Sequence, residues 1–187
     1  NDEFFEEYVP EYRDRLKYSW GEADVIDCYS AAMHLVNSGK ADPKLLAIEG
    51  SSAGGFTALS CLCFTDIFRV GACKYPVVDL LEMNKFTHRF EEKYLEYLIG
   101  NIDQDYNNYI TRSPIRNIDK IDSPVILFQG LKDKVVSPKD TREMYNELKN
   151  RGITSELHLF DNEGHGFKDG LTRVKVLKET ERFFRDH

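Results

Sequence analysis

Residues 45–56 read Leu-Leu-Ala-Ile-Glu-Gly-Ser-Ser-Ala-Gly-Gly-Phe, and this stretch decides the fold that we expect for the chain. Its first four residues form a short, unbroken apolar run, which is typical of a strand buried on both faces of a parallel sheet. The small residues from Ser51 to Gly55 predict a tight turn. A helix should follow, with Phe56, Leu59 and Leu62 on its buried side. The stretch therefore predicts one strand–turn–helix unit of an α/β fold.

Strands and helices are expected to alternate along most of the 187 residues. Further buried strands are predicted at 70–75, 124–128 and 153–160, and helices at 22–38, 86–99, 138–152 and 171–185. The side chains expected on the buried helix faces are Val25, Tyr29, Ala32 and Val36; Phe86, Phe90, Tyr94 and Tyr97 or Leu98; Thr141, Met144, Tyr145 and Leu148; and Val174, Leu177 and Phe184. This alternation predicts a mainly parallel sheet with helices on both faces, in a single domain over residues 1–187.

The composition excludes several classes of function. With 25 Lys and Arg against 32 Asp and Glu, the net charge of −7 and the lack of a basic stripe predict no nucleic-acid partner. No apolar run reaches the ~18 residues of a membrane span, and residues 1–7 lack the basic start of a signal peptide. Cys28, Cys61, Cys63 and Cys73 lie in apolar stretches without a C-x-x-C spacing, so we expect buried, reduced thiols and no zinc site. We therefore predict a cytoplasmic protein with no cofactor and no metal.

Gly50 and Gly54 place Ser52 in a G-x-S-x-G pattern directly after the expected strand. In this context the pattern is typical of a nucleophile elbow, a sharp turn that lifts a serine above the end of a sheet. The strained backbone of such a serine requires small neighbours, which the two glycines supply. The N–H of Ala53, at the start of the helix, would face a developing oxyanion. The alternative interpretation is an ordinary glycine-rich turn, and the pattern alone does not separate the two.

Two later residues supply the groups that an activated serine needs, a base and a carboxylate that orients it. Asp133 follows the strand predicted at 124–128, and His165 follows the strand predicted at 153–160. Each has a simpler interpretation, Asp133 as a carboxylate that stabilises a turn and His165 as a surface loop residue. However, serine, acid and histidine occur in the order used by α/β-hydrolases, each after its own strand. We therefore predict a catalytic triad of Ser52, Asp133 and His165.

The sequence around these residues resembles the prolyl oligopeptidase family, in particular its acylaminoacyl-peptidase and dipeptidyl-peptidase-like members. The matching stretches are 52–56 (Ser-Ala-Gly-Gly-Phe), 128–138 (Phe-Gln-Gly-Leu-Lys-Asp-Lys-Val-Val-Ser-Pro) and 163–167 (Glu-Gly-His-Gly-Phe), supported by 11–16, 20–21, 87–91 and 112–115. The resemblance runs from about Tyr12 to the end of the chain. It implies an α/β-hydrolase fold and hydrolysis of short peptides or acylated N-termini through an acyl-enzyme. Ser52 would attack, His165 would transfer the proton and Asp133 would hold the imidazole tautomer.

Other residues have weaker functional interpretations. The resemblance places Tyr75, Val77 and Val78 after the second strand, where they would line a substrate pocket; core packing is the alternative. His88 is expected to be a structural or surface residue rather than a second base, and His34 and His158 have no partner motif. Four charged residues could bind a substrate terminus, but a charged surface is the simpler interpretation: Glu91, Glu92, Arg112 and Arg116. Two other functions stay open, a carboxylesterase with the same triad and a non-catalytic module that retains the fold.

The chain departs from the family's pattern before the elbow. In an α/β-hydrolase the elbow strand is interior and several strands precede it, whereas residues 1–43 contain no convincing buried strand. The second oxyanion donor normally comes from a loop in that earlier part, and the β-propeller of full-length prolyl oligopeptidases is also missing. An open strand edge favours pairing with another strand. We therefore expect that self-association, or a missing N-terminal segment or chain, completes the sheet.

Overall fold

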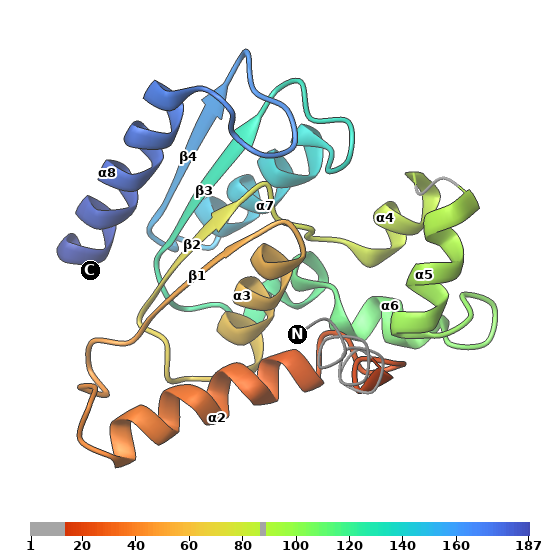
Figure 1. Cartoon of the computed structure of the whole chain (residues 1–187), viewed down its shortest axis with the longest axis horizontal. Helices are drawn as coiled ribbons and strands as arrows, with labels where there is room; N and C mark the ends of the chain where they lie inside the picture. The colour runs from red at the N-terminus through yellow and green to blue at the C-terminus, as the bar shows by residue number, and fades with distance from the viewer. Residues whose placement is uncertain (1–13, 87–88) are drawn as a thin grey trace, which may run out of the picture.

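Four parallel strands form the centre of the molecule in the computed structural model, which describes residues 14–86 and 89–187 (Figure 1). They are β1 (Ala47–Ser51), β2 (Val70–Lys74), β3 (Val125–Gly130) and β4 (Ser155–Phe160), and each pairs with the next in chain order. Because the strands are parallel, their carboxyl ends meet at one edge of the sheet. The loops after all four strands therefore reach the same region. The predicted parallel α/β sheet is confirmed.

Helices cover both faces of this sheet, as predicted. On one face lie α2 (Ala23–Asn37), α3 (Ala53–Phe64) and α7 (Pro138–Asn150), which share a core with Val125 and Leu127 of β3. On the other face lies α8 (Gly170–Asp186), which packs on the alternate residues Ile126 and Phe128 (Figure 1). Among the described residues no helix is both long enough and apolar enough to cross a bilayer.

A group of short helices lies beside the carboxyl end of the sheet. It contains α4 (Leu80–Phe86), α5 (Arg89–Ile99), α6 (Tyr106–Arg112) and the 3-10 segment η1 (Pro114–Lys120), drawn in green in Figure 1. The buried side chains of α4, α5 and α6 pack against Phe56 of α3 and Val136, which follows β3. Ile115 and Ile118 of η1 pack instead on the core that α3 shares with β3. The group thus supports the two loops that carry the expected serine and acid. The helix predicted over 86–99 corresponds to α5, which begins at Arg89 and ends at Ile99. The preceding helix α4 was not predicted from the sequence.

Four of the described side chains that were predicted on buried helix faces are exposed. Tyr29 and Tyr94 are exposed, at 40% and 54% of their surface. On α8, Val174 and Leu177 are exposed and the buried face is formed by Val176, Thr180 and Phe183. This helix carries apolar residues on two sides, and its contacts with β2 and β3 decide which side is buried. The predicted positions Phe86 and Phe90 have side chains outside the described set.

The first strand is less buried than its sequence predicts. It begins at Ala47, and Leu45 lies before it with 78% of its surface exposed. Ala47 and Glu49 are exposed as well. The reason is that β1 is an edge strand: within the described residues it pairs with β2 alone.

Residues 14–20 do not cover this edge. The N–H groups of Tyr18 and Trp20 donate to the carbonyls of Tyr97 and Leu98 on α5, at 3.0 and 3.2 Å. This segment therefore lies against the short helices and away from β1. Residues 1–13 lie outside the described residues.

Candidate active site

Ser52 occupies a sharp turn between β1 and α3. Its backbone has φ of +54° and ψ of −118°, a left-handed region that non-glycine residues rarely adopt. A Cβ atom at position 50 would lie 2.0 Å from the carbonyl oxygen of Gly54, so the turn requires glycine at position 50. At Gly54 a Cβ would meet nothing within 4 Å among the described atoms, so the predicted need for a small residue there is wrong.

The turn is fixed to the neighbouring strand by hydrogen bonds. The N–H of Ser52 donates to the carbonyl of Lys74 at 2.9 Å, and the N–H of Val77 donates to the carbonyl of Ser52 at 3.4 Å. Ala53 is the first residue of α3, so its N–H belongs to the helix N-terminal amides that lack an intrahelical acceptor. The elbow therefore presents a hydroxyl beside a helix N-terminus.

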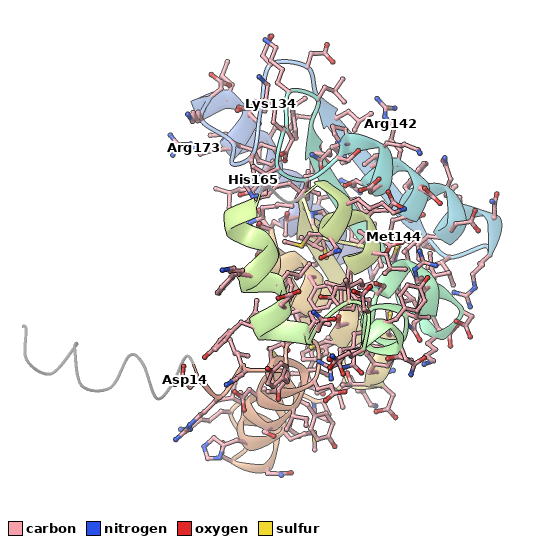
Figure 2. All side chains as sticks on the ribbon, turned by 90° about the vertical axis from the view of Figure 1, so that its right-hand side faces the viewer. Asp14, Lys134, Arg142, Met144, His165 and Arg173 are labelled. Atoms are coloured by element: carbon pink, nitrogen blue, oxygen red, sulfur yellow. The ribbon has the colours of Figure 1, made fainter. Side chains whose placement is uncertain are left out.

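The three residues of the expected triad lie in hydrogen-bond contact. The Nε2 atom of His165 lies 2.8 Å from the Oγ atom of Ser52, and its Nδ1 atom lies 2.9 Å from the Oδ2 atom of Asp133. With Nδ1–H donating to the carboxylate, Nε2 is free to accept the serine hydroxyl proton. Figure 2 shows His165 and Lys134, the residue after Asp133, toward the same end of the molecule and far from Asp14.

Asp133 is held by groups on its own loop. Its side chain is fully buried, and its Oδ1 atom accepts the N–H groups of Val135 and Val136 at 2.8 and 2.9 Å. The Oδ2 atom accepts Nε2–H of Gln129 at 3.1 Å as well as the imidazole. Because two amides occupy Oδ1, the carboxylate presents Oδ2 to His165 in one orientation.

Gln129 is a supporting residue to which the sequence analysis gave no role. It is fully buried at the end of β3, and its Oε1 atom accepts the Thr141 hydroxyl of α7 at 2.8 Å. One side chain therefore joins the acid to the neighbouring helix. A glutamine at the end of an otherwise apolar strand was the signal that could have indicated this role, because buried amides are hydrogen-bonded.

Glu163 holds the loop that carries His165. Its carboxylate accepts the N–H groups of Lys168 and Asp169 at 2.9 and 3.0 Å, and these bonds lower the pKa of Glu163. Its carbonyl accepts the N–H of Lys132 at 2.8 Å, which joins the histidine loop to the acid loop. From the sequence, Glu163 was recognised only as part of a family motif, and its contacts with the two loops were not predicted.

Tyr75 lies beside the base. Its backbone has φ of +38°, its N–H donates to the carbonyl of Phe128 at 2.7 Å, and its ring meets the ring of His165 at 4.8 Å. Phe167 contacts the same tyrosine ring at 5.0 Å. These contacts restrict the space in which the imidazole can move.

A cavity of about 390 Å³ opens next to Asp133. Val77 and Val78, two of the predicted pocket residues, line it together with Met83, Val135 and Val136, whereas Tyr75 is not among the lining residues. Its polar lining includes Asp79 and Asp140. Asp79 is paired with Arg116 at 2.8 Å. The pKa of Asp140 is raised, first by burial and then by the neighbouring carboxylates of Glu82, Glu143 and Asp79.

Two of the other candidates, Arg112 and His34, take no part in this site. Arg112 is buried and donates to the carbonyls of Tyr18 and Trp20 at 2.9 and 3.1 Å, so the expectation of a surface charge is wrong. His34 is exposed on α2. The placement of His88 and the side chains of Glu91 and Glu92 lie outside the described set.

His158 belongs to a cluster on the α8 side of the sheet. Its ring stacks on Phe128 at 5.2 Å, and its ligand atom lies within 4.8 Å of carboxylate oxygens of Glu156 and Glu179. Such a set could in principle hold a metal ion. However, the guanidinium of Arg182 donates to both carboxylates, so this position already holds a cation. The cluster does not fit a metal site.

Comparison with known proteins shows which family the chain belongs to. The sequence profile of the prolyl oligopeptidase family matches residues 6–187. The chain is 29% identical over 153 residues to the acylamino-acid-releasing enzyme of Arabidopsis thaliana. The aligned region covers 78% of this chain and 20% of that enzyme. It is 25% identical over 175 residues to the dipeptidyl peptidase family member 6 of Caenorhabditis elegans. This aligned region covers 89% of this chain and 23% of that protein.

A solved structure shares both fold and sequence with the chain. The puromycin-hydrolyzing peptidase of Mycobacterium tuberculosis is 38% identical, with a TM-score of 0.90, over 93% of this chain and 27% of that one. The chain thus spans 20% to 27% of the length of these relatives. Because the family profile covers nearly all of it, the chain belongs to the prolyl oligopeptidase family.

Proposed function

We propose that this chain carries the reacting residues of a serine peptidase. The observation that supports this most strongly is the continuous hydrogen-bonded series from Ser52 through His165 to Asp133, with distances of 2.8 and 2.9 Å. Ser52 Oγ attacks the scissile carbonyl while Nε2 of His165 accepts its proton. Asp133 stabilises the imidazolium that forms. The protonated His165 then donates to the leaving amine, and water releases the acyl group by the same steps in reverse order.

The N–H of Ala53 is proposed as one oxyanion donor, because it starts α3 directly after Ser52. Removal of one such donor typically lowers turnover by about 10²–10³. A second donor would have to come from outside the elbow. The rate of this chain alone therefore depends on whether another segment supplies that donor.

We propose that the substrate is a short peptide or an aminoacyl or acylated N-terminus, and that the cavity beside Asp133 takes a side chain of the substrate. Val77, Val78, Val135 and Val136 give this cavity an apolar wall, which favours an uncharged side chain at the cleavage site. Puromycin is a suitable first substrate, because the similar solved structures are puromycin-hydrolysing peptidases.

The test has two parts. A fluorophosphonate probe should label the wild-type chain once, at Ser52, and should not label Ser52→Ala. The neighbouring Ser51→Ala is the matched control, because its side chain takes no part in the proposed chemistry, and it should label like the wild type. A folded wild-type chain without an adduct would contradict the assembled site.

Turnover of an aminoacyl p-nitroanilide is then compared with that of the matched p-nitrophenyl ester. Hydrolysis of both substrates supports a peptidase. Hydrolysis of the ester alone supports the carboxylesterase alternative, because an ester needs less protonation of its leaving group. Labelling without turnover of either substrate supports a module that is not a complete enzyme.

We also propose that the open edge of β1 pairs with a further strand, from another segment of a longer chain or from a second copy. In the described part of the chain β1 pairs with β2 alone, and an uncovered strand edge tends to pair. Sedimentation and hydrogen exchange test the proposal together. A monomer whose outward-facing β1 amides are protected from exchange would contradict it.

A further inference from the structure

Two thiols face each other where α2 packs on α3. One turn earlier on both helices, the Thr57 hydroxyl of α3 donates to the carboxylate of Asp24 on α2. Cys28 lies four residues after Asp24, and Cys61 lies four residues after Thr57. Because residues four apart share one face of a helix, the cysteines form the next contact along the same helix pair. Both cysteines pack in the same core cluster.

The two thiols differ in accessibility and acidity. Cys61 is fully buried, whereas Cys28 is only partly buried and can be reached from solvent; the predicted burial of Cys28 is therefore only partly correct. A hydrogen bond from the Cys61 thiol lowers the pKa of Cys28 to about 7, against the opposing effects of burial and of the carboxylates of Asp24 and Asp27. The same hydrogen bond and burial raise the pKa of Cys61. Cys28 is thus the nucleophile of the pair and Cys61 the buried partner.

The other cysteines have no such arrangement. Cys63 and Cys73 are buried, and burial raises the pKa of both, that of Cys63 to about 12. The Cys63 thiol lies 3.9 Å from the carbonyl of Pro114. Neither of these thiols has the exposure or the acidity needed for reaction with a small disulfide.

We propose that Cys28 and Cys61 form a redox-modification site that reacts with a low-molecular-weight disulfide such as glutathione disulfide. In the first step the Cys28 thiolate attacks one glutathione sulfur, a mixed disulfide forms, and the other glutathione leaves as thiolate. In the second step the Cys61 sulfur attacks the Cys28 sulfur, and the second glutathione leaves with the proton of Cys61. The two protein thiols are oxidised to one disulfide, and glutathione disulfide is reduced to two thiols.

The product would join α2 covalently to the helix that begins after Ser52. Its geometry requires Cα atoms about 4.4–6.8 Å apart, a separation that the packing of both cysteines in one core cluster allows. The site is separate from the proposed peptidase reaction, because it uses none of the residues of the triad or the cavity.

Mass spectrometry of the folded chain after incubation with glutathione disulfide tests the proposal. The wild type should lose two hydrogens and give a linked peptide pair that contains Cys28 and Cys61. Cys61→Ser should instead keep one glutathione on Cys28, and Cys28→Ser should gain neither modification. Cys63→Ser is the matched control and should form the disulfide like the wild type. Circular dichroism confirms that each variant is folded.

The rate of alkylation gives an independent measurement. With a pKa of about 7 for Cys28, against about 8.5 for a free cysteine, the thiolate fraction at pH 7 is roughly 15-fold higher. Because the nucleophilicity of a thiolate falls with its pKa, iodoacetamide should modify Cys28 roughly threefold faster than a model thiol of equal exposure. Two results would overturn the proposal: a wild-type chain in which Cys28 stays unmodified, or one in which glutathione stays on Cys28 without transfer to Cys61.

Discussion

The buried amide of Gln129 offers a quantitative test of how the acid of the triad is held. Replacement by methionine keeps a side chain of similar length and removes all of its hydrogen bonds. The Asp133 carboxylate then loses one donor at 3.1 Å, and the Thr141 hydroxyl, fully buried, loses its acceptor at 2.8 Å. The other two contacts, with the carbonyls of Gly130 and Val136, are 3.2 and 3.4 Å long and should add little.

The expected loss follows from these two bonds. A hydrogen bond to a charged group contributes about 1.5–3 kcal/mol and a neutral one about 1 kcal/mol, so Gln129→Met should destabilise the fold by about 3 kcal/mol. For a domain of this size the melting temperature should fall by roughly 6–12 °C. Thr141→Val alone should cost about 1–2 kcal/mol, because it leaves the amide oxygen of Gln129 without a donor.

Urea unfolding of the two single variants and the double variant measures the coupling. Since the two residues share one hydrogen bond, the double variant should be about as stable as Gln129→Met alone, rather than showing the sum of both losses. Fluorophosphonate labelling should slow by roughly tenfold in Gln129→Met, because Asp133 is less firmly oriented. Additive losses, or a Gln129→Met variant within about 0.5 kcal/mol of the wild type, would refute this reasoning.

Three further predictions concern the turn, the histidine loop and the buried arginine. Gly50→Ala should abolish labelling of Ser52, because the new Cβ would lie 2.0 Å from a carbonyl oxygen; labelling at the wild-type rate would contradict this. The lowered pKa of Glu163 means that its stabilisation is present above the unfolded value of 4.5 and is lost as pH falls through the lower folded value. Glu163→Gln should therefore reduce the melting temperature near neutral pH, and the melting temperature of the variant should fall less steeply than that of the wild type below pH 4.5. Thermal melts that show the same dependence of melting temperature on pH for both proteins would contradict the role of Glu163. Arg112→Met should lower the free energy of unfolding in urea by about 2–3 kcal/mol, because the carbonyls of Tyr18 and Trp20 lose their donor. Limited proteolysis should then cleave residues 14–20 faster than in the wild type. No change in either measurement would contradict the proposal that Arg112 holds this segment.

The positions of the strands along the chain and their parallel arrangement could be predicted from sequence, because apolar runs with turn residues between them indicate buried strands and the alternation with helices indicates a parallel sheet. The orientation of individual helices could not. Val174 and Leu177 satisfy the helical period as well as Val176 and Phe183 do, and only the position of the sheet selects between the two faces. The sequence also predicted that the first strand is buried on both faces, whereas Ala47 and Glu49 are exposed. A local apolar pattern does not show whether a neighbouring strand is present.

Sequence reasoning placed Ser52, Asp133 and His165 after three different strands, and the structure brings them into hydrogen-bond distance. The reason is topological, because parallel strands bring their carboxyl ends to one edge. The supporting contacts of Gln129 and Glu163 were missed, since they depend on how loops fold back on themselves. A polar residue in a motif does not show whether its side chain turns inward or outward.

The close approach at Gly130 limits how this protein could be re-engineered. A Cβ atom there would lie 2.5 Å from the carbonyl oxygen of Glu163, so the backbones of the acid loop and the histidine loop are in close contact at this position. A Cβ at Gly164 would meet its nearest atom at an ordinary 3.5 Å. A library that randomises the two loops should keep position 130 constant and can vary position 164. An insertion in one loop would also shift the other, so diversity is best introduced in both loops together.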